Sequence, residues 1–391
     1  MKTPFNKPFL TGHETEYIRQ AVESGKISGN GFFTKKCQQF FERRYGFGKC
    51  LLTTSCTDAL EMAAILTEVG PGDEVIVPSY TFVSSALAFV RQGAKIVFCD
   101  SCRNNPNIDP VEIEKLVTPR TKVIVPVHYA GVACDMDAIM DIARKYGLLV
   151  VEDAAQAIDS FYTGRDGVMR PLGSIGHLAA FSFHETKNII SGEGGMLVVN
   201  DPRFVRRAEV VWEKGTNRAE FFRGEVNKYG WKDIGSSFLP SEIVAAFLWA
   251  QLENLDDIQD RRCFIWNAYR AALAPHAKGS AIDIPDIPPY ATNNAHMFYV
   301  VLPDLDSRTS FIARMRLAGI MCVFHYLPLH RSEYYSRRHD GRELPNCNRF
   351  SDCLVRLPLY YGLEDVDAVC RNVKEGVADV LAEAPNPTVA H

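Results

Sequence analysis

Residues 53–57 read TTSCT and stand at the start of a predicted helix. Free backbone N–H groups and the positive end of a helix dipole attract a phosphate at such a place, and the hydroxyls of Ser55 and Thr57 add donors. The segment is therefore a candidate phosphate site. The alternative is that these residues only cap the helix.

An acidic pair, Glu152 and Asp153, ends a predicted buried strand. A carboxylate at the end of a buried strand is unfavourable unless it meets a cation or several donors, and a protonated ring nitrogen is such a partner. Asp153 is the better candidate, because the small residues after it leave room for a planar ring. The alternative is an Asp that caps the next helix.

A lysine, Lys187, follows the predicted strand Ala179–Phe183, and a glycine-rich segment at 192–195 comes shortly after it. A lysine just past a strand reaches the ligand crevice of a parallel sheet, and glycines let the backbone approach a ligand closely. Partial burial would lower the pKa of the amine and favour a Schiff base. Taken alone, Lys187 is better explained as one of many solvated surface lysines.

The three motifs together match the needs of one cofactor. Pyridoxal phosphate requires a phosphate anchor, a partner for its pyridinium nitrogen and a Schiff-base amine. The segment 53–57, Asp153 and Lys187 supply these in turn. The Asp would keep the ring protonated, so that the ring accepts electrons when the α-proton of a substrate leaves.

Alternating strands and helices must position these motifs. Apolar runs at Glu74–Val77, Lys95–Cys99, Lys122–Val127, Leu148–Val151, Ala179–Phe183 and Met196–Val199 predict strands, several of them apolar on both faces. Helical spacing at Ser84–Arg91, Pro110–Val117 and Asp135–Tyr146 separates them. This order predicts an α/β fold with a mostly parallel sheet between helix layers, which binds ligands beyond the carboxyl ends of its strands.

Further helices are predicted at Glu14–Ser24, Lys35–Tyr45, Thr57–Val69 and Ser241–Leu255. After the last of these the composition shifts to charged and proline-rich segments, followed by a strand-like run at His296–Leu302. We therefore expect a large cofactor-binding domain over residues 1–250 and a smaller C-terminal α+β domain over 251–391.

The composition excludes several classes of function. With 43 Lys+Arg against 47 Asp+Glu, the net charge of −4 supplies no basic surface for nucleic acid. No signal peptide or membrane span is expected, and 11 irregularly spaced cysteines point to reduced thiols in the cytoplasm. Cys99 and Cys102 form a CxxC without a second ligand pair, so no metal site is expected.

The motifs resemble those of the DegT/DnrJ/StrS family of sugar aminotransferases, which are fold-type I pyridoxal-phosphate enzymes acting on nucleotide-linked oxo-sugars. The resemblance rests on Ser28-Gly29 and on residues 70–75 (GPGDEV), 78–82 (PSYTF), 107–109 (NID), 126–128 (PVH), 152–156 (EDAAQ), 182–187 (SFHETK) and 192–195 (GEGG). Residues 126–134, 184–188, 213–218 and 233–237 are most similar to family members that aminate C4 of TDP-4-oxo-6-deoxyglucose.

The resemblance implies roles for individual residues. Lys187 would be the Schiff-base lysine and proton shuttle, and Asp153 would hold the pyridine nitrogen. Phe82 would stack on one face of the ring, and Gln156 would lie near its hydroxyl side. The residues expected to bind the phosphate are Ser55, Cys56, Thr57 and Ser182.

The resemblance also implies a homodimer with shared active sites. The family often has an Asn two residues after the glycine matching Gly235, where it reaches the phosphate of the other subunit. Here that position is Ser237, and the usual Arg two residues further on is Leu239. A serine can still donate one hydrogen bond to the phosphate.

Six residues are candidates for substrate contacts. His184, His325 and Tyr326 would line the sugar pocket, although a packed strand and turn explains the last two equally well. Basic side chains could pair with the diphosphate of the nucleotide, or could belong to a solvated basic face. They are Lys214, Arg218 and Arg223.

The presence of Lys187, where related dehydratases have histidine, favours transamination. The resemblance implies a ping-pong reaction in which L-glutamate donates the amine and TDP-4-oxo-6-deoxy-D-glucose accepts it, giving TDP-4-amino-4,6-dideoxy-D-galactose for a surface polysaccharide. The opposite C4 stereochemistry, amination at C3, and a catalytically silent regulatory protein on the same fold remain alternatives. A dehydrogenase is disfavoured because no GxGxxG follows the first strand.

Overall fold

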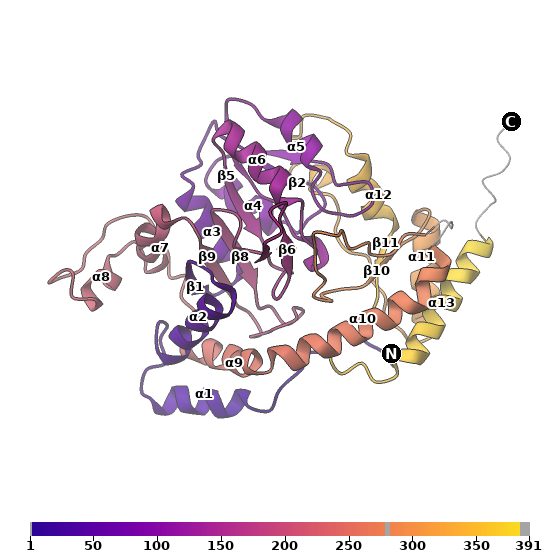
Figure 1. The fold of residues 1–391 in the computed structure, drawn as a ribbon, viewed down its shortest axis with the longest axis horizontal. Helices are drawn as coiled ribbons and strands as arrows, with labels where there is room; N and C mark the ends of the chain where they lie inside the picture. The colour runs from indigo at the N-terminus through magenta and orange to yellow at the C-terminus, as the bar shows by residue number, and fades with distance from the viewer. Residues whose placement is uncertain (1, 278–281, 384–391) are drawn as a thin grey trace.

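A seven-stranded sheet forms the centre of the molecule (Figure 1). The computed structural model describes residues 2–277 and 282–383. The strands lie in the order β1-β9-β8-β5-β4-β2-β3, and all run parallel except β9. Their bounds are β1 Lys49–Thr53, β2 Glu74–Pro78, β3 Lys95–Cys99, β4 Thr121–Ile124, β5 Leu149–Asp153, β8 Leu178–Ser182 and β9 Gly195–Val199.

The six predicted strands are all present, with ends shifted by a few residues at most. Strand β1 was not predicted, because its apolar residues are only Cys50, Leu51 and Leu52 before the chain turns into the hydroxyl-rich segment. Antiparallel pairing with β9 makes it a strand. The predicted fold class, a mostly parallel sheet between helix layers, is confirmed.

Helices cover both faces of the sheet, because neighbouring residues of each strand point to opposite sides. Leu52 and Ala179 face a core shared with α2, α6 and α9, whereas Leu51 and Ala180 face a core shared with α3, α4 and α7. The helices of these layers are α1 Glu14–Glu23, α2 Phe32–Tyr45, α3 Cys56–Leu66, α4 Ser84–Arg91, α5 Pro110–Leu116, α6 Met136–Tyr146, α7 Val205–Trp212 and α9 Glu242–Glu253.

A third core lies in the C-terminal part of the chain and begins at Ile265. It joins a two-stranded antiparallel sheet, β10 Tyr299–Val301 with β11 Leu354–Arg356, to α10 Leu255–Ala277, α11 Leu305–Leu317 and α13 Val366–Glu383. The domain boundary near residue 250 stays a prediction, since α9 and α10 follow one another closely across it. The predicted second domain also includes residues 278–281 and 384–391, which lie outside the described residues.

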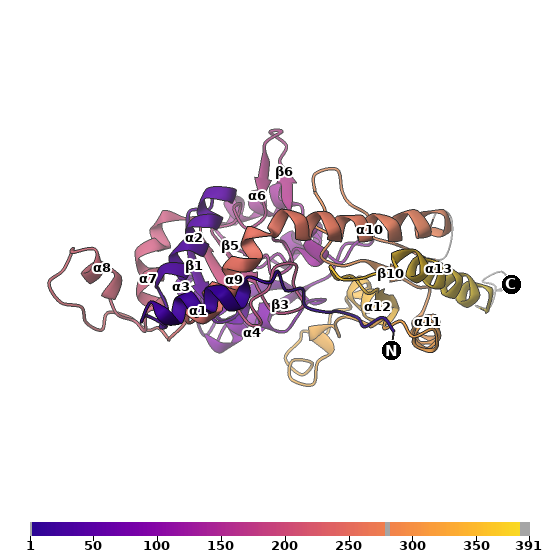
Figure 2. The same ribbon diagram turned by 90° about the horizontal axis from the view of Figure 1, so that it is seen from below.

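Smaller elements complete the chain. They are the hairpin β6 Phe161–Thr163 and β7 Met169–Pro171, the helices α8 Arg218–Phe222 and α12 Pro345–Cys353, and the 3-10 helices η1 Tyr129–Gly131, η2 Pro202–Phe204 and η3 Leu329–Arg331. In both views α8 projects from the end of the molecule opposite to α13 (Figures 1 and 2). Within residues 2–277 and 282–383, no helix combines the length and apolar character needed to cross a bilayer.

Candidate active site

A cavity of about 550 Å³ opens at the carboxyl ends of the parallel strands. Eleven of the fifteen predicted site residues line it, so residues from positions 55 to 326 are brought to one place. They are Ser55, Cys56, Thr57, Phe82, Asp153, Gln156, Ser182, His184, Lys187, His325 and Tyr326. The carboxyl end of a parallel sheet is where α/β proteins bind ligands.

The N-terminus of α3 forms one end of this cavity. The Ser55 hydroxyl accepts a hydrogen bond from the Asp58 N–H at 3.1 Å, so Ser55 is also the helix cap that the alternative interpretation required. The N–H groups of Cys56 and Thr57 precede any intrahelical acceptor and remain available to an anion. Gly195 of β9 packs beneath this turn, where a Cβ would lie 2.4 Å from the Cys56 nitrogen.

Asp153 ends β5 and is held by two hydrogen bonds. One carboxylate oxygen accepts from the Ser85 hydroxyl at 2.6 Å, and the other accepts from the Ala155 N–H at 3.1 Å. Ser85 is fully buried and also bonds the Thr81 hydroxyl at 2.9 Å. The carboxylate is thus fixed in orientation while it faces the cavity.

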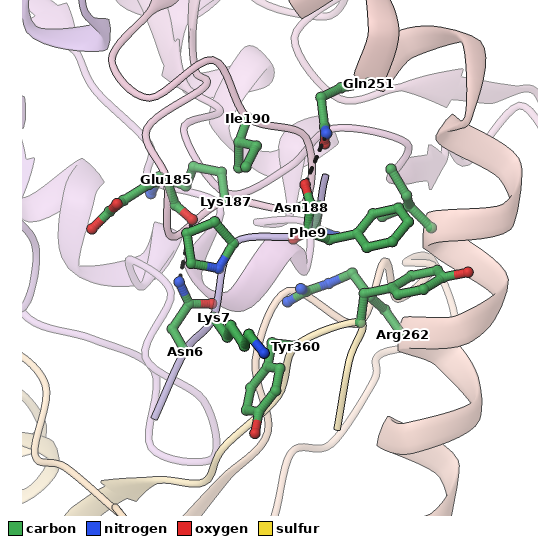
Figure 3. Close-up of a pocket in the computed structure, with 13 residues that line it drawn as sticks. Asn6, Lys7, Phe9, Glu185, Lys187, Asn188, Ile190, Gln251, Arg262 and Tyr360 are labelled. Carbon is green, nitrogen blue, oxygen red and sulfur yellow. Dashed lines mark hydrogen bonds between the residues drawn. The ribbon is translucent and has the colours of Figure 1, made fainter. Parts of the chain in front are cut away.

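Lys187 lies in the loop between β8 and β9, and its side chain reaches the cavity. Burial lowers the pKa of its amine, and the nearby positive charge of Arg356 acts in the same direction, against the opposing effects of Cys56 and Asp153. A larger fraction of neutral amine is what Schiff-base formation requires. In Figure 3 the N-terminal segment crosses this loop, where the Asn6 amide donates to the Glu185 carbonyl at 3.2 Å.

Aromatic and polar side chains also line the cavity. The rings of Phe82 and Tyr326 lie 6.2 Å apart, and the Gln156 amide donates to the Tyr326 hydroxyl at 3.0 Å. The His325 ring bonds the Tyr129 hydroxyl at 2.7 Å. Burial holds the pKa of His325 well below its usual value, and nearby positive charges add to this effect, so the imidazole is neutral at pH 7.

Four predicted site residues lie outside this cavity. Ser237, Lys214, Arg218 and Arg223 belong to the segment 213–237, which carries α8. Ser237 is exposed and pairs with Glu213 in an isolated bridge. Arg223 forms ion pairs at 2.7 Å with Glu209 and with Glu225, so part of its charge is already balanced. The roles proposed for these four residues stay predictions.

Several residues of the site were not identified from the sequence. Ser85, which does not line the cavity but holds Asp153, lies in a helix that looked like ordinary packing, and the cavity residues Phe5 and Asn6 come from an N-terminal segment without a motif. Arg356 carried a usable signal, because it is a lone charge within the apolar run Leu354–Leu359. A charged residue in a buried strand indicates a partner that the strand itself does not provide.

The donor set fits pyridoxal phosphate. Helix N–H groups with Ser182 and Thr57 suit a phosphate, the Asp153 carboxylate suits a protonated ring nitrogen, and the Lys187 amine suits a Schiff base. In the described part of the chain, no group of three or more His, Cys, Asp or Glu side chains is arranged to hold a metal ion. All 11 cysteines, Cys99 and Cys102 included, are free thiols.

Comparison with known proteins gives a consistent result. The model of the DegT/DnrJ/EryC1/StrS aminotransferase family matches residues 8–374. The spore coat polysaccharide biosynthesis protein SpsC of Bacillus subtilis (strain 168) is 34% identical, with 97% of each chain covered.

Similar solved structures include Spr1654 of Streptococcus pneumoniae in its PMP form, which is 27% identical with a TM-score of 0.88 over 97% of this chain and 100% of that one. The same protein has been solved in a PLP form. The aminotransferase TlmJ of Streptoalloteichus hindustanus is 29% identical with a TM-score of 0.87 over 97% of this chain and 99% of that one. This chain belongs to the DegT/DnrJ/EryC1/StrS aminotransferase family and is a pyridoxal-phosphate-dependent sugar aminotransferase.

Proposed function

We propose that the enzyme transfers an amino group from L-glutamate to C4 of TDP-4-oxo-6-deoxy-D-glucose, giving TDP-4-amino-4,6-dideoxy-D-galactose. The observation that carries the catalytic part is the meeting of Lys187, Asp153 and the α3 N-terminus around one cavity. The motifs at 126–134, 184–188, 213–218 and 233–237 support the choice of sugar. The similarity to SpsC supports a place in surface polysaccharide synthesis.

Each side chain has a task in this scheme. When bound, pyridoxal phosphate supplies an electron sink for the electron pair left on the substrate carbon. The α3 N-terminus would hold its phosphate, and Asp153, kept in place by Ser85, would stabilise the positive charge of its ring nitrogen. The Lys187 Nζ takes the α-proton of the donor and returns a proton to the sugar carbon, a transfer that its lowered pKa favours near neutral pH.

We also propose a homodimer in which the segment 213–237 covers the cavity of the partner. This segment exposes large apolar side chains, with Trp231 exposed by 84% and Phe222 by 66%. The segment projects from the end of the molecule opposite to the C-terminal core (Figures 1 and 2). It therefore does not cover the cavity of its own chain. A partner subunit would cover these side chains and bring Ser237 toward a second phosphate.

The cytoplasm is the proposed location, and the free thiols support it.

The reaction is tested by following the cofactor absorbance of the loaded enzyme. L-glutamate should convert the PLP form to the PMP form, and TDP-4-oxo-6-deoxyglucose should restore it. NMR of the product should place an axial amine at C4. An equatorial amine, or an amine at C3, would refute the proposed product and select one of the two other aminotransferase activities.

The dimer is tested by sedimentation of the wild type and of Trp231→Ser. The wild type should sediment as a dimer, and the variant should dissociate at a higher protein concentration. A monomeric wild type with full activity would contradict the shared site.

A further inference from the structure

A buried amide stands beside the candidate lysine. Asn188 follows Lys187 in the chain, is 5% exposed and does not line the active-site cavity. Its Nδ2 donates to the Gln259 Oε1 and to the Asn294 carbonyl, each at 2.8 Å, and its Oδ1 lies 2.8 Å from the His296 Nδ1. All three partners belong to α10 or to the segment after it, so these contacts tie the lysine loop to the C-terminal part of the chain.

The same contacts fix the tautomer of His296. Both partners of the Asn188 Nδ2 are oxygens, so the Asn188 oxygen faces the imidazole, and this oxygen can only accept. The proton of His296 is therefore on Nδ1. Burial lowers the pKa of His296 well below its usual value, and the positive charges of Lys187, Arg262 and Arg356 add to this effect. The ring is therefore neutral at pH 7 and donates to Asn188.

The segment 294–296, which carries this ring, is itself held from two sides. Arg262 of α10 donates to two carbonyl oxygens of the segment, at 3.1 and 2.7 Å. The Asn294 amide donates to the carbonyls of Gln156 and Ile158, in the loop after β5, at 2.8 and 2.7 Å. Figure 3 shows the Arg262 side chain pointing from its helix toward the lysine loop. The imidazole is thus held in a fixed place between two loops of the active site.

The position of the lysine loop bears on the reaction. Backbone hydrogen bonds from Lys187 to the His184 carbonyl at 2.9 Å and from Ser191 to the Phe183 carbonyl at 2.7 Å shape the loop locally. They do not attach it to the C-terminal part of the chain, which the Asn188 side chain does. Displacement of a reacting group by about 1 Å can slow a reaction by about 100-fold. The contacts of Asn188 therefore affect how well the Lys187 Nζ reaches the proton that it moves.

We infer that His296 is a positioning residue for the reaction, because its hydrogen bond to Asn188 fixes the loop from which the Lys187 Nζ transfers the proton. The inference rests on the role proposed for Lys187 but not on the identity of the donor or the sugar. It requires that the Nδ1–H of His296, rather than its Nε2, is the group that the reaction needs.

Two substitutions separate the two nitrogens of the ring. In His296→Asn the amide nitrogen lies as far from Cβ as Nδ1 does, so the donor to Asn188 is kept and Nε2 is lost. In His296→Gln the amide nitrogen lies one bond further out, as Nε2 does, so the donor to Asn188 is lost.

Single turnovers with L-glutamate follow conversion of the PLP form to the PMP form. His296→Asn should react within about 3-fold of the wild type, and His296→Gln should be slower by about 10-fold or more. With α-deuterated L-glutamate, His296→Gln should show an isotope effect at least as large as that of the wild type, because the proton transfer is the step that is slowed.

Hydrogen exchange of the cofactor-free proteins provides a readout that does not depend on the reaction. The backbone N–H groups of residues 184–192 should exchange faster in His296→Gln than in the wild type, and at the wild-type rate in His296→Asn. The strands of the central sheet should be unchanged in both variants. His330→Gln is the matched control, because His330 is also buried and bonds the Ser79 hydroxyl through Nδ1 at 2.7 Å, but does not line the cavity. It should match the wild type at residues 184–192 and in the single turnovers.

The inference is overturned if His296→Gln reacts and exchanges like the wild type. It is also overturned if His296→Asn is slowed by about 10-fold or more, which would assign the role to Nε2 and does not require His296→Gln to fold.

Failure of the proposed function gives different results. If loaded Lys187→Ala converts the cofactor at the wild-type rate, the lysine does not transfer the proton and the inference falls with that role. If L-glutamate converts none of the proteins, the proposed donor is wrong, and hydrogen exchange at residues 184–192 decides whether His296 holds the loop.

Discussion

Loss of the negative charge should lower stability at Glu152 and activity at its neighbour Asp153. Glu152 is fully buried and does not line the cavity. Its carboxylate accepts hydrogen bonds from the His128 ring and from three backbone N–H groups. Burial alone would raise the pKa of Glu152, but these donors hold it below its usual value. We expect Glu152 to support the fold and Asp153 to support catalysis.

The structure sets the size of the effect for Glu152→Gln. One glutamate oxygen accepts from Ile175 and Gly176, and the other accepts from His128 and Gly173. In either orientation, the amide nitrogen of a glutamine would face two N–H donors. Two hydrogen bonds to a charged group are lost, at about 1.5–3 kcal/mol each, so the free energy of unfolding should fall by about 3–6 kcal/mol.

Moving the ring proton of His128 from one nitrogen to the other does not relieve this conflict. The Cys134 N–H donates to the His128 Nδ1 at 3.2 Å, so the proton must be on Nε2, the atom that faces Glu152. Moving the proton would leave the Cys134 N–H without an acceptor. The loss is a large share of the about 5–15 kcal/mol by which domains are stable.

Asp153→Asn should behave differently. Its oxygen can still accept from the Ala155 N–H, and its amide can donate to Ser85, whose hydroxyl then donates to Thr81. The hydrogen-bond count is preserved, so the free energy of unfolding should change by about 1 kcal/mol or less. Loss of the charge opposite the ring nitrogen should slow the donor half of the reaction by ~30-fold or more, which corresponds to about 2 kcal/mol.

Urea unfolding of the cofactor-free proteins and single turnovers of the loaded proteins measure the two effects. Glu114→Gln serves as the control, because its ion pair with Lys145 is on the surface, where solvent screening leaves such a pair little effect on stability. The reasoning is refuted if Glu152→Gln is as stable as this control. It is equally refuted if Asp153→Asn is destabilised as strongly as Glu152→Gln.

Three further predictions concern pH and the cofactor site. Burial beside other basic groups lowers the pKa of His330 from 6.5 to about 4. As the pH falls from 6.5 to 4, this histidine therefore becomes protonated in the unfolded chain but not in the native state. Thermal unfolding should therefore show a steeper loss of stability over this range for the wild type than for His330→Asn, and equal slopes would contradict this. Gly195→Ala would push a Cβ to 2.4 Å from the Cys56 nitrogen, and cofactor titration should show binding weakened by ~10-fold or more, whereas unchanged affinity would argue against a phosphate at this turn. In the cofactor-free enzyme, competitive acetylation read by mass spectrometry should label Lys187 at a lower pH than Lys115, whose pKa is raised by an ion pair, and the reverse order would exclude the lowered pKa.

Some features followed from the sequence because they depend on neighbours along the chain. The inner strands are buried on both faces, so they read as continuous apolar runs, and their order with the helices predicted a parallel sheet. The same rule placed Asp153 and Lys187 at strand ends, where ligands bind. The resemblance of the motifs then identified the family.

Other features depend on contacts between distant parts of the chain. Strand β1 exists because β9 pairs with it. Ser85 fixes the orientation of the Asp153 carboxylate because β5 brings that carboxylate within 2.6 Å of the Ser85 hydroxyl. Arg356 reaches the cavity because β11 pairs with β10 and the N-terminal Phe5 packs against it. Local patterns do not encode such pairings, since each depends on which distant surface the fold brings near. The sequence by itself therefore predicted six of the seven strands, the cofactor and the candidate lysine, whereas the tertiary structure decided which side chains surround and charge the site.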